Sequence, residues 1–196
     1  GGGNGNALAR EAMEDDVSFP RLYRAHAAAP WGSPEWTALD VLAYLLADGE
    51  SSRLQRSLVR ERQLVQDVDA YLYPTELAGV FGVVATARSG VDAQTVAGAV
   101  DDVLRGVAAG TVDEAEIAGA VRRARRDQLD DLALVEERAE LLAWAATALG
   151  DADALADVLA GYGSVTPDDV QRAAERFLLR GGAEVTVIPG EEADGE

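Results

Sequence analysis

The hydrophobic period of the chain changes near residue 64, and this change constrains the fold more than any other feature. Between Trp36 and Leu46, apolar residues recur every three or four positions, which is typical of a helix with a buried face. A second helix is expected over residues 51–62. From residue 64 to 74 the period is two, which predicts a strand, and VFGVVATA at residues 80–87 predicts its antiparallel partner. Two consecutive helices followed directly by a hairpin are therefore expected.

The remaining helices are marked by the residues at their starts. Serine, threonine or aspartate before a helical pattern, often with proline at the first position, is typical of an N-terminal cap. Such signals predict helices over residues 34–47, 92–108, 111–132 and 166–179, the third with a capping box from Thr111 to Glu114, and helical patterns also run over 135–149 and 151–159. FPRLYRAHAA at residues 19–28 and EVTVIP at residues 184–189 suit an opening and a closing strand.

This order of elements predicts the fold class. We expect the hairpin and the two terminal strands to form one antiparallel-rich mixed sheet with helices packed on one face, an α+β fold. A single domain is predicted over residues 17–189. The glycine- and asparagine-rich start, GGGNGN, predicts a linker over residues 1–16, and residues 190–196 suit an acidic solvated tail.

Composition excludes several kinds of partner and chemistry. The net charge is -18, and all 17 basic residues are arginine. A surface this acidic repels phosphate backbones and anionic lipid, so neither nucleic acid nor a membrane is an expected partner. There is no cysteine, hence no thiolate ligand or thiol nucleophile. No apolar run is long enough to span a bilayer, so we expect a soluble protein, with the cytoplasm favoured as its location.

Catalytic and metal-ligating patterns are not found in the sequence. A zinc site built on imidazoles needs at least two histidines, and this chain has only His26, which is expected to be a core or edge residue of the first strand. Ser51 and Ser52 suit a helix cap better than a nucleophile. The arginines at 122, 123, 125 and 126 lie among acidic residues, as on a solvated helix with internal ion pairs. We therefore expect no metal and no catalytic residue in this chain.

Six short motifs occur in a fixed order. They are PRLY at 20–23, DGESSRL at 48–54, LVRERQL at 58–64, GT at 110–111, VTPDDV at 165–170 and VTVIP at 185–189. Together they resemble the C-terminal half-domain of pitrilysin/insulinase-type zinc metallopeptidases, a family that includes the mitochondrial processing peptidase subunits. In that family, the resemblance implies, two similar α+β halves close like a clamshell around an extended peptide.

The resemblance also implies that the two halves have different roles. The N-terminal half carries an H-x-x-E-H zinc motif, and zinc-activated water cleaves the peptide bond. This chain would be the non-catalytic half, with the zinc in a partner half or subunit. Many relatives contribute an arginine and a tyrosine to the substrate. These positions fall on Arg60 and on Gln66, which can donate a hydrogen bond but cannot stack as tyrosine does. Arg60 and Gln66 are therefore the candidate substrate-binding residues.

Alternatives remain open from the sequence. Arg60 could instead be a cation at a helix end, paired with Glu61 or Asp67. For Arg53, we expect structural pairing within this half. A chain of this fold could also serve as an assembly subunit without proteolysis, as in respiratory-complex core proteins, and an unrelated α+β interaction domain is a third possibility.

Overall fold

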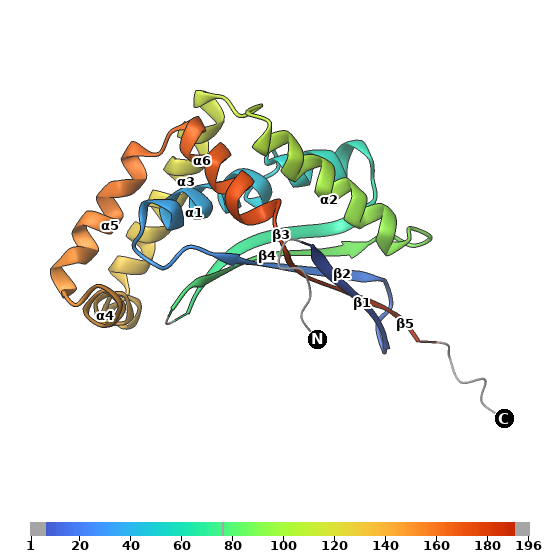
Figure 1. The fold of residues 1–196 in the computed structure, drawn as a ribbon, viewed down its shortest axis with the longest axis horizontal. Coiled ribbons are helices and arrows are strands. Elements are labelled where there is room, and N and C mark those ends of the chain that lie inside the picture. Colours follow the sequence, from blue (N-terminus) through green and yellow to red (C-terminus); the bar gives the residue numbers. More distant parts are fainter. Residues whose placement is uncertain (1–6, 76, 191–196) are drawn as a thin grey trace.

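The computed structural model describes residues 7–75 and 77–190, and within these ranges five strands form one sheet (Figure 1). The strands are β1 (Leu8–Asp15), β2 (Arg21–Ala28), β3 (Val65–Pro74), β4 (Gly79–Ala87) and β5 (Gly182–Pro189). Their order across the sheet is β1-β5-β2-β4-β3. Only the pair β1 and β5 is parallel, and the other three pairs are antiparallel. The predicted α+β class with an antiparallel-rich mixed sheet is confirmed.

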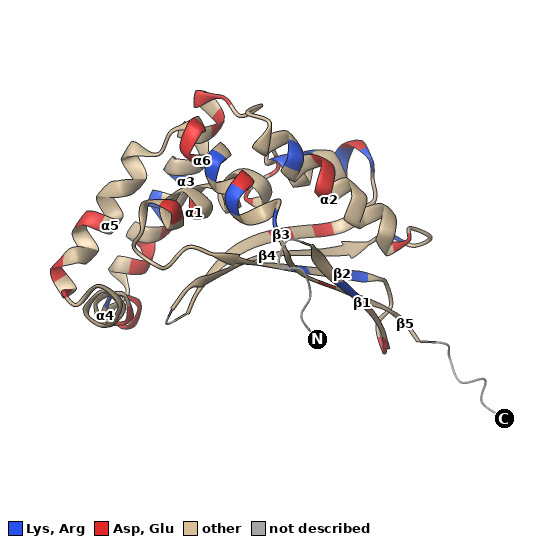
Figure 2. Cartoon of the chain, in the orientation of Figure 1, with Lys and Arg blue, Asp and Glu red and all other residues tan. Residues whose placement is uncertain are grey.

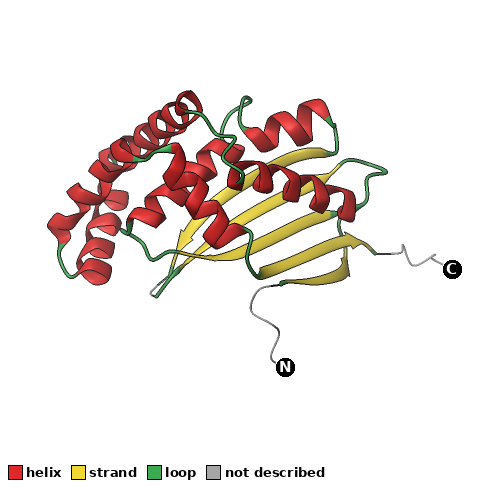
Figure 3. Ribbon diagram, turned by 45° about the horizontal axis from the view of Figure 1, so that its top comes forward, coloured by secondary structure: helices red, strands yellow, loops and turns green. Residues whose placement is uncertain are grey.

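Helices cover one face of this sheet and leave the opposite face bare, as Figure 3 shows. The α-helices are α1 (Pro34–Ala47), α2 (Ala93–Ala108), α3 (Glu114–Ala133), α4 (Val135–Trp144), α5 (Leu155–Gly161) and α6 (Pro167–Ala173). Wider π-type segments are η1 (Gln55–Glu61), η2 (Ala145–Leu149) and η5 (Ala174–Leu178), and short 3-10 segments are η3 (Ala152–Ala154) and η4 (Tyr162–Ser164). Among the described helices, none combines the length and hydrophobicity needed to cross a bilayer.

Side-chain caps explain where the helices begin, at Ser33 and Thr166 as predicted and at Asp113 instead of the predicted Thr111. The Ser33 hydroxyl accepts a hydrogen bond from the backbone N–H of Trp36 at 3.2 Å and starts α1. At the start of α3, Asp113 accepts from the N–H of Glu116 at 2.9 Å, and the Glu116 carboxylate accepts from the N–H of Asp113 at 3.2 Å. Thr166 caps α6 with the same reciprocal pair.

The core lies between the sheet and the helix layer. Its largest fully buried side chains come from both layers: Phe81, Leu22, Leu39, Leu42, Leu46, Leu54, Leu58 and Leu104. Helix α1 is buried on nearly all sides, because β3 lies beneath it and α3 and α6 pack beside it. Charged residues gather largely on the helices, and much of the sheet carries none (Figure 2).

Part of the predicted linker is instead a strand. Residues 8–15 form β1, which runs parallel to β5 with Leu8 opposite Gly182 and Asp15 opposite Pro189. All but one of the β1 residues are exposed, so the strand has no alternating apolar pattern to reveal it. Its backbone hydrogen bonds to the free edge of β5 stabilise it, and that edge is created by a segment far away in sequence. Residues 1–6 and 191–196, which include most of the predicted linker start and acidic tail, lie outside the described residues.

The corner between η1 and β3 has an unusual backbone. The N–H of Arg62 donates to the carbonyl of Ser57, five residues back, at 2.9 Å. Gln63 then adopts a φ of 51°, in the left-handed region, the only residue other than glycine to do so in the described part of the chain. The N–H of Leu64 closes the turn by donating to the Leu58 carbonyl at 2.8 Å. A strained position at the end of a helix is thus what turns the chain into β3.

Candidate functional site

The bare face of the sheet is lined mainly by tyrosines and apolar residues, with Asp69 among them. On β2, Leu22 and Arg24 point toward the helices, so Tyr23 between them points to the opposite side. Tyr23 is 38% exposed, and its direct neighbours across the sheet are Val84 on β4 and Val185 on β5. We call this surface the open sheet face and define it by Met13, Tyr23, Asp69, Tyr71, Tyr73, Val80, Gly82, Val84 and Val185.

Tyr71 packs over the neighbouring strand on the open sheet face. It stands opposite Gly82 in the β3–β4 pair and is 44% exposed. A β-carbon built at Gly82 would lie 2.6 Å from Tyr71 Oη and 2.7 Å from Cε1, so the ring rests on the glycine backbone. Tyrosine presents an apolar ring with a polar tip, which suits contact with a peptide. Sequence reasoning missed this face, although strict alternation in β2 and β3 identifies its residues once the helix side is known.

Gln66 lies at one corner of the open sheet face. The β3–β4 register shifts between Val65 and Asp67, which leaves Gln66 as an extra residue in a β-bulge. Its side-chain amide donates to the Ala87 carbonyl at 3.1 Å. Gln66 also lines a 460 Å³ cavity together with Asp16, Val17, Ser18, Phe19, Arg21, Asp67 and Thr86. The bulge therefore turns the Gln66 side chain toward a solvent-accessible hollow at the sheet end.

Arg60 lies on η1 and points into solvent. Its guanidinium pairs with Glu50, not with Glu61 or Asp67, and both side chains of that pair are more than half exposed. An ion pair this exposed contributes little to stability. Arg60 does not line the cavity at Gln66. The two predicted substrate-binding residues therefore flank the same helix-to-strand corner but bind different partners, Glu50 for Arg60 and the Ala87 carbonyl for Gln66.

Arg53 is bound within this half, as expected. Its Nε and Nη2 donate to the two carboxylate oxygens of Glu116 at 2.9 and 2.7 Å, and its Nη1 and Nη2 reach the side chain and carbonyl of Thr111 at 2.7 Å. The hydrogen bond from Arg53 lowers the pKa of Glu116. This bidentate pair fixes η1 against the start of α3.

No metal site is evident in the described residues. In residues 7–75 and 77–190, no three His, Asp or Glu side chains are grouped so that they could hold a metal ion. His26 is buried on β2, beneath the helices, and its Nδ1 donates to the Gly181 carbonyl at 3.0 Å. Burial lowers the pKa of His26. The expectation that His26 is a structural residue of the strand is consistent with this position.

Comparison with known proteins identifies the class and then the family. The fold is that of a non-catalytic α+β peptidase domain, since the sequence of residues 7–124 matches the family model of the peptidase M16 inactive domain. That match covers more than half of the chain. The chain therefore belongs to the peptidase M16 family as its inactive domain, which confirms the resemblance to the pitrilysin/insulinase type. No curated protein matches the sequence.

Solved structures share the whole fold at low sequence identity. A protease from Helicobacter pylori superposes with a TM-score of 0.85 at 19% identity, over 95% of this chain and 45% of that one. An inactive peptidase domain of a provisionally assigned zinc protease from Bordetella parapertussis gives 0.81 at 24% identity, over 93% and 97%. A chain of Complex III2 from Candida albicans gives 0.75 at 18% identity, over 92% and 46%. The chain thus spans less than half of the Helicobacter pylori and Candida albicans chains and nearly all of the Bordetella parapertussis domain.

Proposed function

We propose that this chain is the non-catalytic half of a zinc metalloendopeptidase and that the open sheet face forms one wall of its peptide chamber. The observation that carries the proposal is the asymmetry of the sheet, because helices bury one face while the other exposes Tyr23, Tyr71 and Tyr73. An exposed apolar face of this kind usually marks an interaction site. Membership of the M16 family supports an opposing half that bears the zinc, supplied by a longer polypeptide or by a separate subunit in a heterodimer.

The open sheet face has chemistry suited to an extended peptide. Tyr23, Tyr71 and Tyr73 offer rings for apolar side chains and hydroxyls for backbone carbonyls. Val80 and Val84 lie next to these tyrosines on β4 and present short apolar side chains. Such a surface contacts many peptide sequences without selecting one strongly. We therefore propose that this half encloses the peptide and that the zinc-bearing half performs peptide-bond hydrolysis.

Arg60 and Gln66 are proposed to hold the peptide at the chamber edge. The pairing of Arg60 with Glu50 is exposed and weak, so a substrate carbonyl or carboxylate can replace Glu50 at little cost. The Gln66 amide uses one N–H on the Ala87 carbonyl, which leaves its second N–H and its oxygen for a peptide backbone. The two side chains would then bind the substrate from opposite sides of the η1–β3 corner.

An assembly subunit without proteolytic activity is the second candidate. It is favoured by the likeness in fold to a chain of Complex III2 from Candida albicans. In that case the open sheet face would hold a protein partner permanently, and no peptide would be cleaved.

The test is reconstitution with a family member that carries H-x-x-E-H. The two proteins are mixed, and cleavage of a quenched-fluorescence peptide library is measured for each alone and for the mixture. We expect this chain alone to bind no stoichiometric zinc and to cleave nothing, and the mixture to be active. Measured zinc near one per chain, or cleavage by this chain alone that a chelator stops, would contradict the non-catalytic assignment.

A matched pair of variants tests the wall itself. Val84→Arg places a charge at the centre of the open sheet face, and Val135→Arg makes the same change at a 70% exposed position on α4. With both variants folded, we expect Val84→Arg to lower kcat/KM at least tenfold, about 1.4 kcal/mol, with Val135→Arg unchanged. Equal activity of the two variants would contradict the proposal that the open sheet face is a wall of the peptide chamber. A stable complex that cleaves no peptide would favour the assembly subunit.

A further inference from the structure

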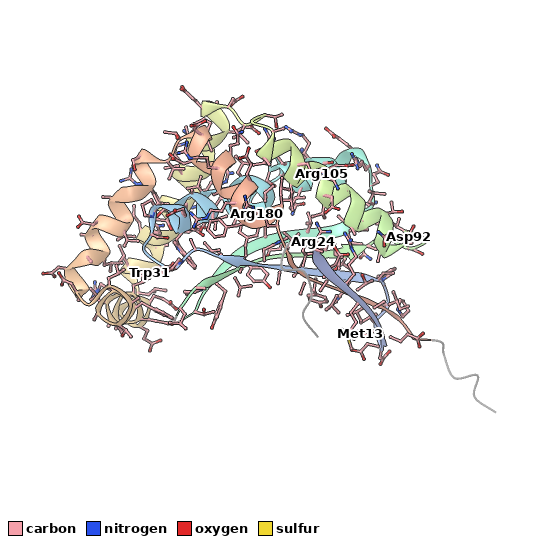
Figure 4. All side chains as sticks on the ribbon, in the orientation of Figure 1. Met13, Arg24, Trp31, Asp92, Arg105 and Arg180 are labelled. Atoms are coloured by element: carbon pink, nitrogen blue, oxygen red, sulfur yellow. The ribbon has the colours of Figure 1, made fainter. Side chains whose placement is uncertain are left out.

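A second cavity lies on the opposite side of the sheet, beneath the helices. It has a volume of 150 Å³, and its polar lining consists of Arg10, Arg24, His26, Asp101, Arg105 and Arg180. Four of these residues are arginines and one is a carboxylate, in a chain with a net charge of -18. Arg24, Arg105 and Arg180, labelled in Figure 4, come from β2, α2 and the segment after η5. We call this the arginine cavity.

The carboxylates around the arginine cavity are shared among several guanidinium groups. Arg24 is almost fully buried and pairs with both Glu184 and Asp101. Asp101 also lies 3.2 Å from Arg105 Nη2 and 3.8 Å from Arg10 Nη2, and Glu184 accepts from Arg10 Nε at 2.9 Å. Arg105 Nη1 also lies 3.3 Å from Asp102, so three carboxylates serve these three arginines. Because each guanidinium has five N–H donors, Arg10 and Arg105 retain donors that these carboxylates do not satisfy.

Arg180 adds a positive charge with no counterpart in the described part of the chain. No Asp or Glu oxygen among residues 7–75 and 77–190 lies within 4.0 Å of its guanidinium. Its side chain is exposed at the rim of the cavity, next to the Gly181 carbonyl that binds His26. The cavity therefore has an excess of cationic donors at its mouth.

His26 supplies an acceptor at the inner wall. The residue is 3% exposed, and its Nε2 has no hydrogen-bond partner in the described residues. Because Nδ1 must carry the proton to donate to the Gly181 carbonyl, Nε2 of the neutral ring bears a lone pair. A buried acceptor without a partner costs about 1–3 kcal/mol. An occupant that donates a hydrogen bond to Nε2 would remove this cost.

We propose that the arginine cavity binds a small protonated oxyanion of the hydrogen phosphate type. Hydrogen phosphate matches both requirements, because its P–OH can donate to His26 Nε2 while its other oxygens accept from the arginines. A cavity of 150 Å³ has room for such an ion, since water occupies about 30 Å³ per molecule in the liquid. The site is separate from the open sheet face and goes beyond the proposed peptidase function. The phosphate could be free or the head of a small monoester.

The experiment is calorimetric titration of the full chain with inorganic phosphate in a low-salt buffer at neutral pH. We expect saturable binding at one site. Arg180→Gln is expected to weaken phosphate binding at least threefold, while Arg138→Gln, an exposed arginine on α4, leaves it unchanged. Glycerol phosphate, titrated in parallel, distinguishes the sources: binding as tight as that of phosphate indicates a monoester, and weaker binding indicates the free ion.

Sulfate tests the part played by His26. Sulfate has the shape of phosphate but carries no proton at neutral pH, so it cannot donate to Nε2 and should bind more weakly. In His26→Phe the preference for phosphate over sulfate should disappear. If that variant does not fold, the comparison of Arg180→Gln with Arg138→Gln still tests whether phosphate binds in the arginine cavity. No saturable binding of phosphate, or equal weakening by both arginine substitutions, overturns the proposal and leaves the proposed peptidase function untouched.

Discussion

The ring of Tyr71 rests on Gly82 of the neighbouring strand, and a β-carbon at Gly82 would lie 2.6 Å from Tyr71 Oη. Glycine is therefore required for this ring position. We expect Gly82→Ala to displace Tyr71 and to lower the free energy of unfolding by about 1–3 kcal/mol, as overpacking does. Thermal or urea denaturation measures the change.

Gly98 provides the matched control for this substitution. It is exposed within α2, and nothing lies within 4 Å of a β-carbon built there. Gly98→Ala should stabilise the helix by roughly 0.5–1 kcal/mol. If Tyr71→Ala abolishes the penalty of Gly82→Ala in the double variant, the clash with the ring is its cause. A full penalty in the double variant would place the cause elsewhere.

Arg53 and Arg60 should respond differently to the same change. Arg53 is mostly buried and makes hydrogen bonds to Glu116 and Thr111, so Arg53→Ala should cost about 1.5–3 kcal/mol of stability. Arg60 makes one exposed ion pair, so Arg60→Ala should cost no more than about 0.5 kcal/mol. In an assembly with a zinc-bearing half, Arg60→Ala is expected to reduce turnover more than stability. Equal losses in both would indicate that Arg60 serves only the end of its helix.

Asp40 should make stability depend on pH in an unusual direction. Burial raises the pKa of Asp40 from 3.8 to about 6, although the Tyr162 hydroxyl, which donates to it at 2.6 Å, opposes the shift. The folded state therefore keeps this proton to a higher pH than the unfolded chain does. The resulting stability is present below about pH 4 and is lost as pH rises through about 6.

Asp40→Asn isolates this contribution, since its amide oxygen can still accept from Tyr162. The variant should gain stability relative to the wild type, by about 2 kcal/mol, between pH 4 and pH 7.5. Urea denaturation at both values measures it, and Asp130→Asn, an exposed site on α3, is the control. Parallel pH dependence in the wild type and in Asp40→Asn would contradict the raised pKa.

Gln63 is expected to gain from replacement by glycine. Its φ of 51° lies in the left-handed region, where a side chain costs roughly 1–2 kcal/mol and glycine costs little. After the larger entropy of glycine in the unfolded chain is included, Gln63→Gly should raise stability by about 0.5–1 kcal/mol. The same change at Gln94, in α2, should instead destabilise. A loss of stability in Gln63→Gly would show that its side chain is needed at the corner.

The candidate site was only partly readable from the sequence. The helix-to-strand corner at residues 60–66 was located correctly, because its signal is a local change of period. The bulge that turns Gln66 outward was not foreseen, since it depends on the β3–β4 register. The alternative in which Arg60 pairs with Glu61 or Asp67 is wrong about the partner, because the Arg60 guanidinium pairs with Glu50.

The sequence by itself determined the elements whose causes are local. Helix starts at Ser33 and Thr166 follow from side chains that bind backbone groups within three residues, and the hairpin follows from period two and a short connection. The start of α3 was predicted only to within two residues, because its capping box lies at Asp113 and Glu116 and not at Thr111 and Glu114. Only the tertiary structure decided which face of the sheet the helices cover, that residues 8–15 join β5, and that Arg24 meets Glu184, 160 residues away. These depend on contacts between distant segments, and a fully exposed edge strand or a buried ion pair leaves no periodic trace in the chain.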